Sequence, residues 1–375
     1  MPKPSNKHLY WAEIGLGALE SNYHALKEFG GEERELICVI KSNAYGHGLA
    51  EVARHLYALG ARKFAVSCFR EAIDVDGCLG DNHGAEILIL GYTPPAFARE
   101  LGKGSIIQSV GSLRYAEELR LSAGYPLNVH IKLDTGMHRR GIYLGDYESA
   151  RDEISKILAI HSVSGLYTHL HSADGESEID RKRTIAQISL FNSATSSIST
   201  DLTRHILNSA GVIRYIDTAP RALTEVIRPG IALYGVSPSS EMRLPSSFVP
   251  SLSLYTVIAE IKDVHPGESI GYGATFTAEK KMRIAILPIG YGEGYKRSLS
   301  GRGSVLIKDT PCPIVGRVCM NMTAVDISEV SGATVGDTVT LIGGELSASE
   351  LAEAADTIGY DILTSVSQDI TRIYI

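Results

Sequence analysis

The sequence lacks several features that mark whole classes of protein. It carries no basic excess, because 36 lysines and arginines stand against 43 acidic residues, a formal net charge of −7. Nucleic acids and anionic membrane surfaces favour clustered basic residues, so neither is expected as a partner. No run of about 18 apolar residues occurs, and the N-terminus has no apolar stretch typical of a signal peptide. We therefore expect a soluble, cytoplasmic protein.

Cysteine is scarce and unpaired in its spacing. The five cysteines stand at positions 38, 68, 78, 312 and 319. An odd number without paired spacing indicates reduced thiols and not a disulfide framework or a zinc site. His169 and His171 would share one face of a strand, but no third or fourth ligand cluster accompanies them. We expect no metal.

The first two-thirds of the chain alternates short apolar runs with segments of helical period. With 375 residues and 44% hydrophobic content, the chain can bury a large core and form two domains. The expected strands are 36–40, 64–67, 86–90, 106–109, 129–133, 163–169, 206–208 and 227–234. The expected helices include 49–59, 113–122, 148–160 and 179–196. Eight such units in roughly 230 residues predict a (β/α)₈ (TIM) barrel, while a doubly wound sheet remains the competing layout.

The composition changes after the eighth unit. Residues 236–247 are rich in proline and serine and indicate a linker. Beyond it, short strands at 254–261, 283–288 and 338–342 alternate with glycine-rich turns, and one helix is expected at 348–358. We predict a barrel over residues 12–238 and a smaller, mostly β domain over 239–375, with which residues 1–11 could pair.

Lys41 stands at the end of the first expected barrel strand. A lysine at the mouth of a buried strand is costly to leave unpaired, which makes it a candidate for Schiff-base chemistry with an aldehyde such as pyridoxal phosphate. The alternative is a lysine whose side chain simply extends into solvent.

Two later segments suit a phosphate group. Asn208 and Ser209 follow the seventh expected strand, and Arg228, Gly230 and Ile231 lie in the eighth unit. In barrels of this kind, phosphate often binds after strands seven and eight. Small residues and free backbone amides suit a phosphate oxygen, although glycine and serine also form ordinary turns.

Eight motifs resemble those of one known family, the bacterial alanine racemases. They occur in the family's order at 39–48, 132–141, 167–169, 208–210, 228–235, 270–276, 288–294 and 316–320. The likeness extends from Trp11 to Tyr374. It implies a barrel-type enzyme that uses pyridoxal 5′-phosphate to interconvert L-alanine and D-alanine, supplying D-alanine for peptidoglycan.

The resemblance implies two bases. Lys41 would hold the cofactor and move the α-proton on one face of the substrate. A second base must act on the opposite face, because one base returning its own proton would regenerate the starting enantiomer. The resemblance assigns this role to Tyr272. A phenol is a poor base at neutral pH, so it needs a cationic or hydrogen-bonded neighbourhood, which the family supplies at His169 and Arg228.

The family also implies how the cofactor is bound. Arg228 would face the pyridine nitrogen and leave it unprotonated, which weakens the ring as an electron sink. The residues expected to bind the cofactor are Lys41, Tyr45, His169, Asn208, Ser209, Arg228, Gly230 and Ile231.

The substrate carboxylate would meet Arg139 and the main-chain amide of Met320. Lys132 matches a family lysine that can be carbamylated to hold that arginine, although a plain strand-end lysine remains the alternative. Because Tyr272 and Met320 belong to the second domain, the family arrangement implies a head-to-tail homodimer with shared active sites.

Three charged residues match positions that line the family's entrance corridor. They are Asp174, Arg297 and Arg317. Ordinary surface ion pairs remain the alternative.

Two departures from the family bear on the substrate. Asn321 stands where an aspartate is usual, and Gln368 aligns where many members carry a tyrosine that walls off the substrate side chain. A smaller or more polar wall would admit serine, so a serine/alanine racemase is the rival enzyme. A non-catalytic pyridoxal-phosphate-binding regulator and a decarboxylase are further alternatives, and the former lacks a β domain.

Overall fold

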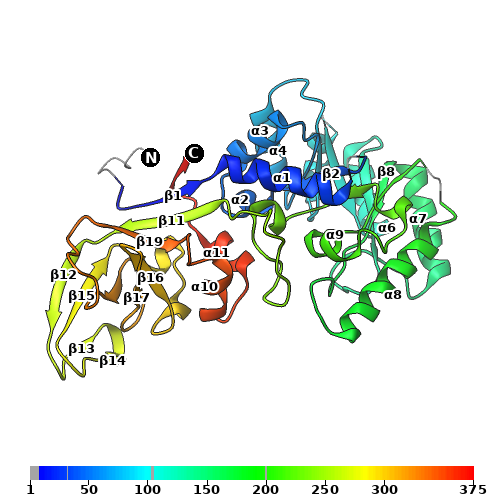
Figure 1. Ribbon diagram of the computed structural model, residues 1–375. Helices are drawn as coiled ribbons and strands as arrows, with labels where there is room; N and C mark the ends of the chain where they lie inside the picture. The colour runs from blue at the N-terminus through cyan, green and yellow to red at the C-terminus, as the bar shows by residue number, and fades with distance from the viewer. Residues whose placement is uncertain (1–7, 32, 103–104, 199–200) are drawn as a thin grey trace.

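The computed structural model describes residues 8–31, 33–102, 105–198 and 201–375. Two lobes make up the molecule (Figure 1). The larger holds parallel strands surrounded by helices, and the smaller is mostly β. Strands β1 (Tyr10–Ile14) and β11 (Leu252–Val257) run side by side from one lobe toward the other.

Eight parallel strands form the larger lobe in the order β10-β2-β3-β4-β5-β6-β8-β9. These are β2 (Glu35–Val39), β3 (Lys63–Val66), β4 (Glu86–Ile89), β5 (Ile106–Val110), β6 (Asn128–Asp134), β8 (Ser162–Tyr167), β9 (Thr203–His205) and β10 (Val226–Ile227). The amide of Arg228 donates to the carbonyl of Leu207 at 2.9 Å, which joins the two ends of the series. The predicted barrel is confirmed, and a doubly wound sheet, which is open, is excluded.

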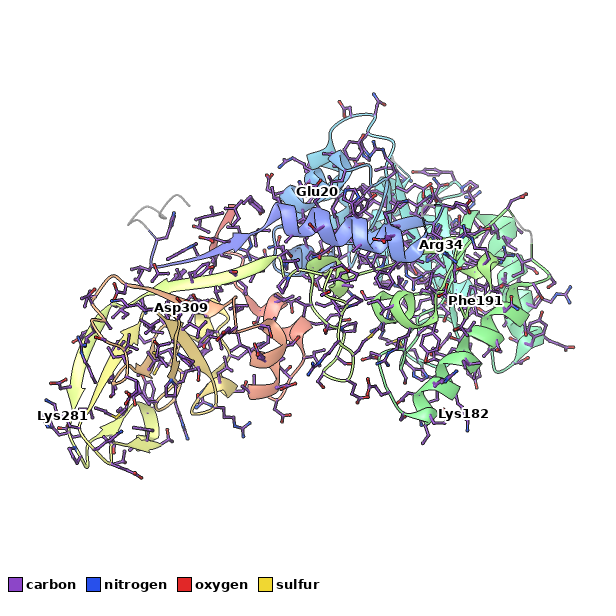
Figure 2. The ribbon with its side chains drawn as sticks, in the orientation of Figure 1. Glu20, Arg34, Lys182, Phe191, Lys281 and Asp309 are labelled. Carbon is purple, nitrogen blue, oxygen red and sulfur yellow. The ribbon has the colours of Figure 1, made fainter. Side chains whose placement is uncertain are left out.

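Helices follow the strands. They are α1 (Leu16–Gly30), α2 (Lys41–Tyr45), α3 (Leu49–Ala58), α4 (Phe69–Leu79), α5 (Ala98–Leu101), α6 (Leu113–Ala123), α7 (Tyr147–Ile160), α8 (Glu178–Thr195) and α9 (Ser209–Tyr215), with a short strand β7 (Ile142–Tyr143) beside β6. Side-chain caps start several of them: Asp146 accepts from the amide of Ser149 at the start of α7. In α8, Phe191 is fully buried while Lys182 projects outward (Figure 2).

The last barrel strands end earlier in the chain than the sequence predicts. The expected strand 227–234 ends at Ile227, because Pro229 and Gly230 break it, and Ile231–Tyr234 form a 3₁₀ turn. The expected strand 163–169 ends at Tyr167, and the expected strand 206–208 is wrong in position, because β9 (Thr203–His205) lies immediately before it. The residues after them are therefore free to turn into the mouth of the barrel.

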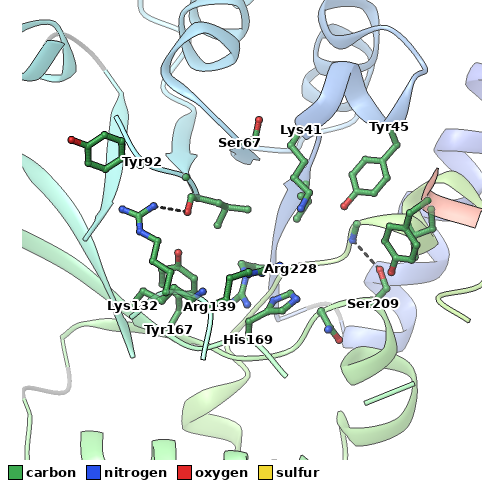
Figure 3. Close-up of a pocket in the computed structure, with 18 residues that line it drawn as sticks. Lys41, Tyr45, Ser67, Tyr92, Lys132, Arg139, Tyr167, His169, Ser209 and Arg228 are labelled. Atoms are coloured by element: carbon green, nitrogen blue, oxygen red, sulfur yellow. Dashed lines mark hydrogen bonds between the residues drawn. The ribbon is translucent and has the colours of Figure 1, made fainter. Parts of the chain in front are cut away.

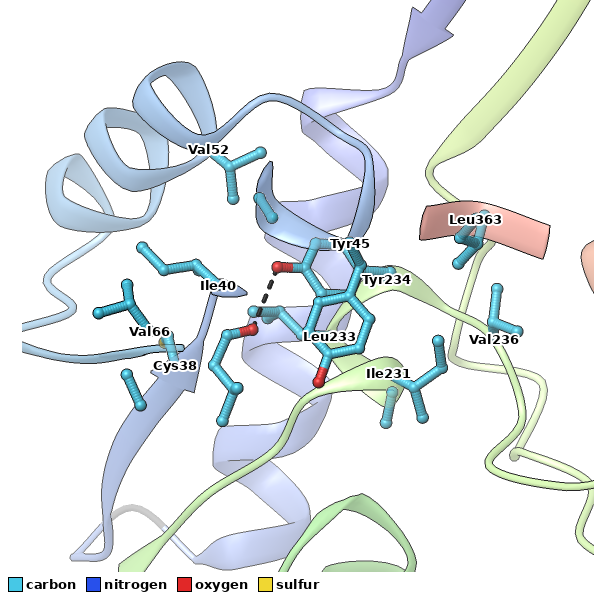
Figure 4. Packing of buried hydrophobic residues seen from close by; sticks show 14 of the residues in the cluster. Cys38, Ile40, Tyr45, Val52, Val66, Ile231, Leu233, Tyr234, Val236 and Leu363 are labelled. Atoms are coloured by element: carbon cyan, nitrogen blue, oxygen red, sulfur yellow. Dashed lines mark hydrogen bonds between the residues drawn. The ribbon is translucent and has the colours of Figure 1, made fainter. Parts of the chain in front are cut away.

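Tyr234 anchors the packing beneath the barrel mouth. It is fully buried, its hydroxyl donates to the carbonyl of Val39 at 3.2 Å, and its ring lies 4.8 Å from that of Tyr45 (Figure 4). The cluster joins β2, the turn after it and the 3₁₀ segment. Burial of such aromatic surface fixes these segments relative to one another.

The smaller lobe is built on a six-stranded sheet in the order β17-β16-β19-β11-β1-β20. Its further strands are β16 (Ser304–Ile307), β17 (Thr310–Pro313), β19 (Thr338–Ile342) and β20 (Thr371–Tyr374). Strand β1 pairs antiparallel with β11 and parallel with β20. The expected pairing of residues 1–11 with this domain falls partly on residues 1–7, which lie outside the described residues.

A second sheet, a hairpin and two helices complete this lobe. The sheet contains β12 (Glu260–Val264), β15 (Met282–Leu287) and β18 (Thr323–Asp326), and the hairpin contains β13 (Ser269–Ile270) and β14 (Phe276–Thr277). The expected strand 254–261 is therefore two strands in different sheets. The expected helix 348–358 ends early as α10 (Ala348–Ala354), where Asp356 takes a left-handed conformation, and a second helix, α11 (Gly359–Ser365), follows.

No helix within the described residues is long and apolar enough to cross a membrane.

Asn22 on α1 connects the barrel to the chain that leaves it. Its amide donates to the carbonyls of Leu233 and Val249 at 3.1 and 2.8 Å, and its oxygen accepts from the amide of Val249 at 2.7 Å. We predict that Asn22→Leu lowers the free energy of unfolding by about 3 kcal/mol, because three main-chain groups, the Leu233 carbonyl being buried, lose their partner. Urea denaturation measures this, with exposed Ser21→Ala as the control; equal values for both variants would contradict the prediction.

Candidate active site

A cavity of about 400 Å³ opens at the carboxyl ends of the barrel strands. Ten of the residues predicted from the sequence line it. They are Lys41, Tyr45, Lys132, Arg139, His169, Asn208, Ser209, Arg228, Gly230 and Ile231. Lys41 and Tyr45 extend into it from one side, and His169, Ser209 and Arg228 lie on the other (Figure 3). The lining has five lysine and arginine side chains, Arg140 being the fifth, and no acid, so the cavity suits an anionic ligand.

Lys41 is carried by an unusual backbone. The four residues after it, Ser42 to Tyr45, have φ between 52° and 55°, so α2 is a left-handed turn. This conformation costs non-glycine residues roughly 1–2 kcal/mol each. Gly46 ends the turn at φ 84°, where a Cβ would lie 2.3 Å from the carbonyl oxygen of Leu363. The strained backbone lowers the stability of the fold, and it directs the Lys41 side chain into the cavity.

The amine of Lys41 is easier to deprotonate than an ordinary lysine. Burial lowers its pKa most, and the charges of Arg139 and Arg228 lower it further, while Glu71 acts in the opposite direction. A neutral amine is the form that attacks an aldehyde and accepts a proton.

Arg228 is buried at the floor of the cavity, and no carboxylate within the described residues forms an ion pair with it. Its Nη1 donates to Nδ1 and to the carbonyl oxygen of His205, both at 2.6 Å, and its Nη2 donates to the carbonyl of Thr168 at 2.7 Å. The guanidinium lies 5.0 Å from the ring centre of Tyr167. Burial lowers the pKa of Arg228 to about 10, so the group remains a cation at neutral pH.

Two histidines continue this network into the barrel. Because arginine only donates, Nδ1 of His205 must be unprotonated and the proton sits on Nε2. That nitrogen lies 2.9 Å from Nδ1 of His130, which therefore accepts. Burial, together with nearby cations that include Arg228, holds the pKa of His205 well below its usual range and lowers that of His130 to about 3. Both rings are neutral, each with a fixed tautomer.

His169 is the third neutral imidazole of the site. Burial, with Arg228 as the next contributor, holds its pKa well below the usual range. His171, two residues later, has Nδ1 2.5 Å from the hydroxyl of Ser172.

The side of the cavity around Ser209 offers hydrogen-bond donors. The hydroxyl of Ser209 accepts from the amides of Gly230 and Ala232 at 2.9 and 3.2 Å, which leaves its own hydrogen for another acceptor. Asn208 caps α9 by accepting from the amide of Gly211. A Cβ at residue 230 would lie 2.5 Å from the hydroxyl oxygen of Tyr45, so glycine is required where the backbone meets the tyrosine.

The remaining predicted residues lie outside this cavity. Tyr272 and Met320 belong to the smaller lobe, where they are 72% and 57% exposed. Tyr272 lies between β13 and β14, which are at the far end of that lobe from the barrel (Figure 1). One chain alone does not bring Tyr272 to Lys41.

The predicted entrance residues do not line the cavity either. Arg317 packs beside Gly273 next to Tyr272, Arg297 starts a 3₁₀ turn, and the carbonyl of Asp174 accepts from Arg214.

Gln368 was expected to take the place of the family tyrosine that walls off the substrate side chain. The structure corrects this expectation. Tyr360 on α11 lines the cavity, with its ring 6.0 Å from that of Tyr45. Gln368 lies outside the cavity lining, in the loop before β20, where its carbonyl accepts from Arg372. Residues 367–372 match the family poorly, and the sequence therefore did not single out Tyr360. Asn321, the other departure, donates to Glu293 at 2.6 Å.

Other lining residues were not predicted. Besides Tyr360 they are Val39, Ser67, Leu90, Gly91, Tyr92, Arg140 and Tyr167. Most follow or end barrel strands, which is the signal that could have found them.

Two sequence models of one family match almost the whole chain. The alanine racemase N-terminal domain matches residues 14–238, and the alanine racemase C-terminal domain matches residues 251–374. The chain belongs to the alanine racemase family. The predicted resemblance is therefore confirmed, and this family member is an amino-acid racemase, an isomerase.

Relatives cover nearly the full length of this racemase. The alanine racemase of Halothermothrix orenii is 36% identical over 380 residues, covering 97% of this chain and 96% of that protein. The alanine racemase of Clostridium perfringens is also 36% identical, over 378 residues, covering 97% and 95% of the two chains.

Solved structures agree with the fold. The alanine racemase from Bacillus anthracis with bound L-Ala-P has a TM-score of 0.88 at 31% identity, covering all of this chain and 96% of that one. The alanine racemase from Bartonella henselae with covalently bound pyridoxal phosphate has a TM-score of 0.87 at 26% identity, covering 98% and 100% of the two chains.

Lys132 in this racemase provides a test of the site's electrostatics. Burial lowers its pKa to about 8, and the charges of Arg139, Arg228 and Arg140 add to the effect. We predict that Lys132 is half neutral near pH 8 and protonated below it, in protein free of bound ligands. Acetylation against pH, followed by peptide mass spectrometry, measures this. Lys156, whose pKa the Asp152 carboxylate raises, is the control; identical titration of the two lysines would contradict the prediction.

Proposed function

We propose that this protein interconverts L-alanine and D-alanine with pyridoxal 5′-phosphate. The observation that carries the proposal is a lysine of lowered pKa opening into a cavity whose floor is a buried arginine cation. The cofactor, when bound, supplies an aldehyde that condenses with amines and a ring that takes up electrons from the breaking bond.

The lining residues fit this cofactor. The hydroxyls of Ser209 and Tyr45 and the main-chain amide of Ile231 would donate to its phosphate. Gly230 leaves room beside the Tyr45 hydroxyl, where a Cβ would lie too close. Asn208 shapes this loop by capping α9.

Arg228 would donate to the pyridine nitrogen, because its fixed charge and donors leave it no capacity to accept. Such a partner keeps that nitrogen unprotonated and limits charge build-up on the ring. Return of the proton is thereby favoured over side reactions.

Arg139 would pair with the substrate carboxylate through its planar guanidinium. Lys132 is neutral often enough near pH 8 to take up carbon dioxide as a carbamate, which would hold Arg139 in place. The main-chain amide of Met320 of the partner subunit would add a second contact to the carboxylate.

Lys41 and Tyr272 of the partner subunit would move the α-proton on opposite faces of the substrate. Tyr272 is exposed on its own lobe, so a head-to-tail homodimer would cover it and complete each site. The neutral His169 and the cation Arg228 would supply the environment in which a phenol can lose its proton. Asp174, Arg297 and Arg317 would select small zwitterions at the entrance.

The proposed function also assigns a role to each domain and a use to the product. Residues 12–238 would carry cofactor chemistry, and residues 239–375 would supply the second base to the partner. D-Alanine for peptidoglycan would be the product used by the cell.

A mixing experiment tests the shared site. Lys41→Ala and Tyr272→Phe homodimers should each racemise L-alanine far more slowly than the wild type, since each lacks one base. Random mixing should restore about one quarter of wild-type activity, because half of the dimers then contain one intact site of two. A chiral assay measures both enantiomers. Mixtures that remain as inactive as the separate variants would contradict a site shared between subunits.

The substrate is tested separately. We predict that L-alanine is racemised faster than L-serine, because Tyr360 restores the aromatic wall that the sequence alone placed in doubt. The chiral assay gives kcat/KM for both amino acids. A higher value for L-serine would identify a serine/alanine racemase, and cofactor binding without turnover of either would favour a non-catalytic regulator.

A further inference from the structure

We propose that Glu71 is a positioning residue for Lys41, holding the left-handed turn that aims the amine. The inference rests on the function proposed for Lys41. Glu71 lies in the first turn of α4 and outside the lining of the active-site cavity, so it acts through the backbone of the turn.

Both oxygens of the Glu71 carboxylate are used. Oε1 accepts from the amide of Asn43 at 3.2 Å. Oε2 accepts from the amide and the hydroxyl of Ser67 at 2.8 and 2.7 Å. The carboxylate therefore ties the second residue after Lys41 to the end of the neighbouring barrel strand, β3.

Other contacts hold the far end of the same turn. The side-chain oxygen of Asn43 accepts from the amide of Leu49 at 2.8 Å. Nε of Arg372 donates to the carbonyl of Gly46 at 2.8 Å. Glu71 supplies the anchor close to Lys41, where loss of the strained conformation would redirect the amine.

Glu71 also contributes the negative charge that acts on Lys41. Among the charged groups that shift the pKa of Lys41, Arg139 and Arg228 lower it and Glu71 raises it. Lys132 and His169 share the cavity with Lys41, and His169 is neutral. Removing the charge of Glu71 should therefore favour the unprotonated nitrogen.

Glu71→Gln separates these roles from folding. A glutamine has the same shape but one acceptor oxygen, and its amino group would face an N–H donor. It cannot hold Asn43 and Ser67 together. The matched control is Glu51→Gln on α3, because Glu51 lines the same surface depression as Glu71 but pairs with exposed Arg54.

The full-length, cofactor-loaded protein is used throughout. In Glu71→Gln, hydrogen exchange in the peptide covering 41–48 should speed up by about tenfold, because the Asn43 amide loses its acceptor. The pH midpoint of the cofactor's absorbance should move down by about half a unit. For L-alanine, kcat should fall while KM changes little, because the amine is misdirected and substrate contacts remain. Glu51→Gln should match the wild type in all three measurements.

The inference is overturned if Glu71→Gln matches Glu51→Gln in exchange and in the absorbance midpoint. Should Glu71→Gln fail to fold, Glu71→Asp takes its place, since it keeps the charge but is one methylene too short to reach both partners. Faster exchange at 41–48 without a fall in kcat would also overturn it. A wild-type protein that racemises nothing would instead sink the proposed function, independently of how the variants compare.

Discussion

The architecture of this site depends on Arg228, a buried cation that has no acidic partner in the part of the chain that the structure describes. Arg228 is held by His205 and by main-chain carbonyls, all of them neutral acceptors. An anionic ligand could therefore balance its positive charge. The other lysines and arginines that line the cavity add further positive charge and favour an anion more strongly. The neutral tautomers of His205 and His130 follow from the same constraint, since a second buried charge beside Arg228 would be strongly unfavourable.

Much of the fold and the site could be predicted from local patterns. The alternation of strands and helices predicted the barrel. Residues that follow strands, such as Lys41, Asn208 and Arg228, lie together because the carboxyl ends of parallel strands share one edge. The pattern did not reveal where strands stop: Pro229 ends the eighth one early, so Gly230 and Ile231 become part of the cavity wall.

The features that escaped prediction depend on contacts between distant segments. Four left-handed residues after Lys41 contradict their own propensities and persist because Glu71, Leu49 and Arg372 hold them. Tyr360 reaches the cavity because α11 packs against the turn, which no local motif announces. Without such a motif, the comparison with the family pattern pointed to Gln368, which lies outside the cavity lining.

The position of β1 determines the order in which the smaller lobe can assemble. Trp11 pairs with Tyr255 and with Thr371, so this strand is translated before the barrel but finds its neighbours only after the barrel has been translated. The barrel is in effect an insertion within the sheet that completes the other lobe. The barrel can therefore fold while the domain that carries Tyr272 still lacks a strand of its main sheet.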